Sequence, residues 1–112
     1  MVKGPFQAEQ YHHRIIKVRE GSSGTDHLET LQAISNLAFM YKLMGQLDRA
    51  EPLYRRVLAS HENHLGPAHN VTAASVSNLA TLLKEKGRFQ ESEALFRRAL
   101  QTREAKHGRA LQ

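Results

Sequence analysis

The chain has 112 residues, of which 24% are charged and 40% hydrophobic, and its formal net charge is +5. This length allows one domain with a modest core and excludes two lobes around a deep cleft. The absence of cysteine excludes a disulfide framework, thiolate metal ligands and a cysteine nucleophile. No apolar run approaches the roughly 20 residues of a membrane span, and the N-terminus has no signal-peptide block. We therefore expect a cytoplasmic protein without a membrane partner.

The first predicted element is a helix over about residues 6–20. It ends at Gly21-Ser22-Ser23-Gly24. This stretch lacks the lysine and the following helix pattern of a phosphate-binding loop, so we interpret it as a linker.

Two further helices are predicted between residues 26 and 66. Asp26-x-x-Glu29 has the form of a capping box, and apolar residues follow it at helical spacing. Gly45 tolerates a positive φ and is expected to end this helix. The next helix begins near Leu47–Asp48, and Gly66-Pro67 ends it.

The last predicted pair spans about residues 70–86 and 89–105, and it repeats the preceding pair at an interval of 42 residues. Residues 27–68 laid over 69–110 give 16 identities, among them Ser35-Asn36-Leu37-Ala38 on Ser77-Asn78-Leu79-Ala80. We expect a preceding half repeat and linker at 1–26, repeats at 27–68 and 69–110, and a stub at 111–112. The predicted fold is all-α, a solenoid of about five helices in antiparallel pairs.

The two complete copies resemble the tetratricopeptide repeat, whose helices carry large-x2-Leu-small-x2-Tyr and then small-x3-aromatic. The first copy has Ile34-x2-Leu37-Ala38-x2-Tyr41 and then Ala50-x3-Tyr54. The second has Val76-x2-Leu79-Ala80-x2-Leu83 and then Ser92-x3-Phe96. The longer period, with AEPLYRRVL at 50–58 and LGPAH at 65–69, resembles the kinesin light chain subclass.

The resemblance implies a noncatalytic scaffold for protein–protein interaction, in which the first helix of each repeat lines a concave groove that binds a peptide. Carried over by position, the groove candidates of the first repeat are Gln32, Ser35, Asn36, Phe39, Lys42 and Leu43. Those of the second repeat are Ala74, Ser77, Asn78, Thr81, Lys84 and Glu85.

The two asparagines are the most specific of these candidates. An amide both donates and accepts hydrogen bonds, so Asn36 and Asn78 are suited to grip the backbone of an extended peptide. The alternative is that each of them bonds a neighbouring helix. Phe39 is interpreted as a pocket anchor, because its equivalent, Thr81, is polar.

Charged side chains suggest the character of the ligand. Lys42 and Lys84 favour an acidic peptide or a C-terminal carboxylate, and the alternative is that they are solvated lysines. The recurring arginine pairs Arg55-Arg56 and Arg97-Arg98 lie on second helices, where we expect convex-face or inter-helix charges.

No catalytic, metal or cofactor site is predicted. His61-Glu62-Asn63-His64 is one residue too short for the zinc-protease helix motif. His27 and His69 recur at the connectors, where helix entry or turn hydrogen bonding explains them better than catalysis does. The only aspartates, Asp26 and Asp48, lie at helix starts.

Two other functions remain open. Unpartnered faces of the terminal helices favour self-assembly of the chain into a homo-oligomer. The basic excess of residues 69–110, with eight positive and four negative residues, allows nucleic-acid binding. Nucleic-acid binding is the weakest hypothesis, because aromatic residues are sparse and no basic run is clustered.

Overall fold

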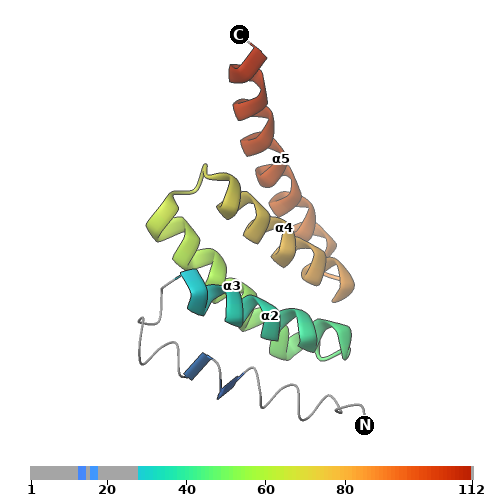
Figure 1. The fold of residues 1–112 in the computed structure, drawn as a ribbon. Coiled ribbons are helices and arrows are strands. Elements are labelled where there is room, and N and C mark those ends of the chain that lie inside the picture. Colours follow the sequence, from blue (N-terminus) through green and yellow to red (C-terminus); the bar gives the residue numbers. More distant parts are fainter. Residues whose placement is uncertain (1–12, 15, 18–27, 112) are drawn as a thin grey trace. The chain divides into compact units, whose positions relative to one another are not determined.

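The structure is a computed structural model that describes residues 13–14, 16–17 and 28–111. It contains four long helices: α2 (Leu28–Leu43), α3 (Leu47–Leu65), α4 (Asn70–Glu85) and α5 (Phe89–Leu111) (Figure 1). The all-α prediction is confirmed, and the expected count of five helices becomes four for the described residues. Of the helix expected at 6–20, residues 13–14 and 16–17 are helical. The Gly-Ser linker, Asp26 and His27 lie outside the described residues.

Glycine ends the first helix of each repeat, as the sequence predicts. Gly45 and Gly87 have φ of 76° and 83°. The N–H groups of Gln46 and Arg88 reach back to the carbonyls of Tyr41 and Leu83, both at 2.9 Å. These bonds satisfy carbonyls that the helix end leaves open, and the positive φ that they require suits glycine.

The observed helix bounds agree closely with the predicted ones except at the end of α5. This helix extends to Leu111, whereas the sequence indicates an end near residue 105. Gly108 does not terminate it, because one glycine inside a helix costs only about 1 kcal/mol. None of the described helices combines the length and the apolar character that a membrane span requires.

The chain divides into two compact units, and the first comprises residues 1–57. Its helices bury the apolar positions of the repeat motif, including Ile34, Leu37 and Tyr41 of α2 and Tyr54 of α3. His13 lies against Tyr41, with 3.0 Å between its Nε2 and the phenol oxygen. Burial of the repeat motif therefore holds this unit together.

The second unit comprises residues 58–112, and α4 and α5 pack closely within it. Val76, Leu79 and Leu83 of α4 are buried, as is Ala99 of α5. The small residues Ala80 and Ser92 lie where the two helices are in contact, and the Ser92 hydroxyl donates to the Ala80 carbonyl at 2.7 Å. The small positions of the repeat motif thus allow the two backbones to approach.

Candidate functional site

Four predicted groove residues form an exposed face along α2. Gln32, Asn36, Phe39 and Leu43 recur at intervals of four, three and four residues, so they lie on one side of the helix. All four are exposed, and the Phe39 side chain is 51% accessible. Gln32 Nε2 donates to Asn36 Oδ1 at 3.1 Å. This face offers amide groups next to an accessible aromatic ring.

The asparagine of each repeat lies beside its buried neighbours but is itself exposed. Leu37 and Ala38 are buried and Asn36 is exposed, and the same holds for Leu79, Ala80 and Asn78. One step along a helix turns a side chain by about 100°, which separates the packing positions from the amide. The described bond of Asn36 stays within α2, so it does not support the alternative that this amide bonds a neighbouring helix.

The remaining groove candidates of α4 differ in exposure. Ala74 and Glu85 are exposed, whereas Ser77 and Thr81 are half-buried, as is Ser35 of α2. The Thr81 hydroxyl donates to the Ser77 carbonyl at 2.9 Å. Thr81 is equivalent to Phe39 by position, but it is half-buried and has no ring to offer, and its hydroxyl bonds within its own helix.

The two recurring lysines lie in different surroundings. Lys42 is half-buried, and its Nζ lies 5.9 Å from the centroid of the Phe39 ring, within the range of a cation–π contact. Lys84 is exposed and lines a hollow with residues of α5. The sequence groups both lysines with the asparagines, whereas the structure places Lys84 beside α5.

The hollow beside Lys84 has a volume of about 350 Å³ and a mainly apolar lining. Phe89, Phe96 and Leu100 line it from α5, together with Ser92, Glu93 and Arg97. The repeat pattern predicts open terminal faces in general terms but does not single out these residues. The signal available in the sequence is their recurrence at intervals of seven and four residues.

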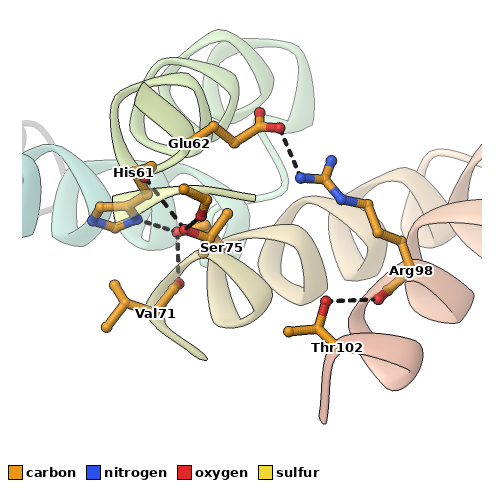
Figure 2. A network of polar contacts seen from close by, with 8 residues as sticks. His61, Glu62, Val71, Ser75, Arg98 and Thr102 are labelled. Carbon is orange, nitrogen blue, oxygen red and sulfur yellow. Dashed lines mark hydrogen bonds and ion pairs between the residues drawn. The ribbon is translucent and has the colours of Figure 1, made fainter. Parts of the chain in front are cut away.

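The end of α3 and the start of α4 form a polar contact that the sequence does not predict (Figure 2). His61 Nδ1 lies 2.5 Å from the Ser75 hydroxyl oxygen, and the Thr72 hydroxyl donates to the Gly66 carbonyl at 2.8 Å. Thr72 and Ser75 are both buried. Thr30 and Thr72 are identical positions of the two repeats in the sequence. Only the structure shows that Thr72 bonds the Gly66 carbonyl.

The electrostatics of this contact centre on His61. Burial lowers the pKa of His61, and positive charge on His69 and then on His64 lowers that pKa further. His69 Nδ1 accepts from the Val71 N–H at 3.0 Å and caps α4, which confirms the predicted role in helix entry. The described residues contain no cluster of three potential metal ligands.

The recurring arginines pair with glutamates. Arg55 and Arg97 each bind the glutamate four residues earlier on the same helix. Arg98 of α5 reaches Glu62 of α3 at 2.7 Å, with about a third of each side chain accessible. The expectation of an inter-helix charge is therefore confirmed for Arg98.

Comparison with known proteins agrees with this architecture. The tetratricopeptide repeat model matches residues 4–63 and 29–105. Among curated proteins, none matches the sequence of this chain significantly.

The solved structures whose folds are similar to that of this chain include the following two. One is BtubC (BKLC) from P. vanneervenii, with 29% identity and a TM-score of 0.82 over 93% of this chain and 42% of that one. The other is a putative kinesin light chain with nearly identical TPR-like repeats from Podospora anserina, with 22% identity and a TM-score of 0.79 over 88% of this chain and 46% of that one. The chain therefore spans less than half the length of these structures.

The matched residues, the buried repeat motif and the paired helices lead to one conclusion. The chain belongs to the tetratricopeptide repeat family, and its structural neighbours include kinesin-light-chain-like proteins.

Proposed function

We propose that this chain is a noncatalytic protein-interaction scaffold, in which the exposed face of α2 and the equivalent face of α4 each bind an extended peptide. Tetratricopeptide repeat domains generally serve as such scaffolds. The observation that carries the proposal is the exposure of Asn36 and Asn78 at equivalent positions, each beside a buried Leu-Ala pair. An exposed amide contributes little to the core, and it can both donate to and accept from a peptide backbone.

The face of α2 supports a ligand with acidic and apolar character. Phe39 offers an accessible ring, and Lys42 places a cation beside it. A carboxylate that approaches Lys42 gains a charge-assisted hydrogen bond, while an apolar side chain of the same peptide covers Phe39. We therefore propose acidic peptides with an apolar residue as the ligand class.

The contact between His61 and Ser75 does not favour an enzyme. A nucleophilic serine must reach its substrate, and Ser75 is only 5% exposed. Its position between α3 and α4 supports a structural role for the pair.

The test compares two double variants of equal composition. The chain has four asparagines, and Asn63 and Asn70 are exposed outside the proposed faces. Binding of fluorescent acidic peptides is measured by anisotropy for Asn36→Ala with Asn78→Ala and for Asn63→Ala with Asn70→Ala. We expect at least about tenfold weaker binding in the first variant only. Equal affinity of the folded first variant and the unmodified chain would rule out the asparagine faces.

Self-association is the second candidate function, and the exposed apolar residues of α5 favour it. Phe89, Phe96 and Leu100 together form an apolar patch on one helix of the second unit. Patches of this kind often mark interaction sites.

A further inference from the structure

The outer face of α5 carries three accessible apolar side chains, here called the α5 stripe. Phe89, Phe96 and Leu100 are 64%, 38% and 54% exposed. Their spacing of seven and four residues places them on one side of the helix, over about 16 Å of its length. A hollow of about 350 Å³ lies along them. The α5 stripe is thus a continuous apolar surface with space for another side chain.

The equivalent positions of the preceding repeat are covered. Tyr54 and Leu58 of α3 correspond to Phe96 and Leu100, and they are only 5% and 7% exposed. The same positions of the repeat are therefore buried in one copy and open in the other. This difference identifies the α5 stripe as a surface that loses water favourably when another helix covers it.

Charges along the α5 stripe indicate which helix fits. Glu93 and Arg97 flank Phe96 and line the same hollow. They bind each other, yet their side chains remain 62% and 72% accessible. Both are therefore available to a second molecule.

The α5 stripe and its flanking charges are complementary to the same residues of a second α5 that runs in the opposite direction. Phe89 and Leu100 lie equally far from a point between Ala94 and Leu95, and Glu93 and Arg97 lie equally far from Leu95. When a second α5 runs antiparallel across the first, Phe89 of each copy meets Leu100 of the other. In that arrangement each Glu93 lies within one residue, or about 1.5 Å along the helix, of the position opposite Arg97 of the other copy. A parallel arrangement instead brings like charges together.

We propose that the α5 stripe is the contact surface of a homodimer, in which α5 of a second copy packs antiparallel across it. This inference rests on the self-association candidate and adds its surface, its orientation and its register. The contact is isologous, so both copies use the same residues and each charge pair occurs twice. Glu104, one turn beyond Leu100, then approaches Lys84 at the Phe89 end of the other copy.

The size of the surface determines the expected strength. Three partly exposed side chains and their flanking charges lie at the low end of the area that specific interfaces bury. We therefore expect a reversible dimer with a dissociation constant in the micromolar range.

The first test is sedimentation equilibrium of the full chain over a concentration series. Phe96→Ala is expected to weaken association at least about tenfold, because it removes the central apolar contact. Phe39→Ala is the matched control, since Phe39 is also an exposed phenylalanine but lies on α2. A wild-type chain that stays monomeric into the millimolar range overturns self-association altogether. A dimer that Phe96→Ala leaves unchanged overturns only the assignment to α5.

The second test uses exposed charges, so that loss of folding does not confuse the result. Glu93→Arg gives two positive positions on the α5 stripe, and Arg97→Glu gives two negative ones. Each variant alone is expected to be monomeric, whereas an equal mixture of the two forms a heterodimer. A mixture that associates no better than the separate variants overturns the proposed charge pairs.

The third test reads the orientation by cross-linking, which the absence of native cysteine makes specific. Gln90→Cys and Gln101→Cys place thiols at exposed positions that flank the two ends of the α5 stripe. Oxidation is expected to link Gln90→Cys to Gln101→Cys in a mixture, and to link neither variant efficiently to itself. Efficient self-linking of Gln90→Cys indicates a parallel contact and overturns the antiparallel register.

Discussion

His61 Nδ1 lies 2.5 Å from the Ser75 hydroxyl oxygen, and this contact joins the end of α3 to the start of α4. Ser75 also bonds the Val71 carbonyl at 3.4 Å, so the serine links the imidazole to the backbone of α4. A titratable ring thus takes part in the packing of the second unit, at a point where burial disfavours its charged form.

The first prediction concerns pH. Because burial, His69 and His64 lower the pKa of His61 in the folded chain, the unfolded chain binds the proton more readily. The free energy of unfolding is therefore highest above the unfolded pKa of about 6.5 and decreases as the pH falls toward the folded pKa. Urea unfolding at a series of pH values checks this, and His61→Gln is expected to flatten the dependence. His13→Gln removes a histidine of the other unit and serves as control. An equal flattening by His13→Gln would contradict the assignment to His61.

The second prediction concerns Thr72, which is fully buried and donates to the Gly66 carbonyl at 2.8 Å. Thr72→Val keeps the shape but removes the shorter of the two bonds to this carbonyl and leaves only the one from the His69 N–H at 3.4 Å, so we expect a loss of about 1–2 kcal/mol in the free energy of unfolding. Thr81→Val is the matched control, because the Thr81 hydroxyl bonds only within its own helix. That change is expected to cost about 0.5 kcal/mol or less. Chemical denaturation measures both, and equal losses would show that the Thr72 bond has no special role.

The third prediction uses two glycines with opposite expectations. Gly87 has φ of 83°, and the space around it is open, so Gly87→Ala adds backbone strain without a collision. We expect a loss of about 1 kcal/mol and a lower melting temperature. Gly108 lies inside α5, where alanine favours the helix, and Gly108→Ala is expected to be neutral or stabilising. Circular dichroism melts compare them, and destabilisation by both changes to the same extent would contradict the backbone argument.

The fourth prediction separates two ion pairs by their exposure. Glu62 and Arg98 join α3 to α5 and are about one-third accessible, so Glu62→Gln is expected to cost about 1 kcal/mol at low salt. Glu93 and Arg97 lie on one helix and are mostly accessible, and Glu93→Gln is expected to leave the free energy of unfolding of the monomer unchanged. Unfolding at low protein concentration, with and without added salt, measures the difference. A larger loss for Glu93→Gln would reverse this ranking.

Much of the fold was predictable from the sequence because its signals are local. Leu37-Ala38 and Leu79-Ala80 predict buried helix positions, and Gly45 and Gly87 predict helix ends. Both signals depend on residues only a few positions away in the chain. The end of α5 was not predictable in this way, because a single glycine such as Gly108 ends a helix only where other features also favour a stop.

The candidate site also has features that local sequence predicts and features that it does not. A repeated asparagine beside a buried pair implies an exposed amide, and the structure agrees for Asn36 and Asn78. The surroundings of Lys84 could not be inferred from its repeat position, because its neighbours Phe89 and Phe96 belong to another helix.

The sequence by itself determined the repeat, its period, the helices and the small residues at which they approach, because helical periodicity and glycine geometry are properties of short segments. Only the tertiary structure decided which polar groups meet and which apolar groups stay open. His61 and Ser75 are 14 residues apart, and Arg98 and Glu62 are 36 apart. Phe96 is exposed where its equivalent Tyr54 is buried. Equivalent repeat positions differ in exposure because burial depends on which residues pack against a side chain. The local sequence does not specify these neighbours in space.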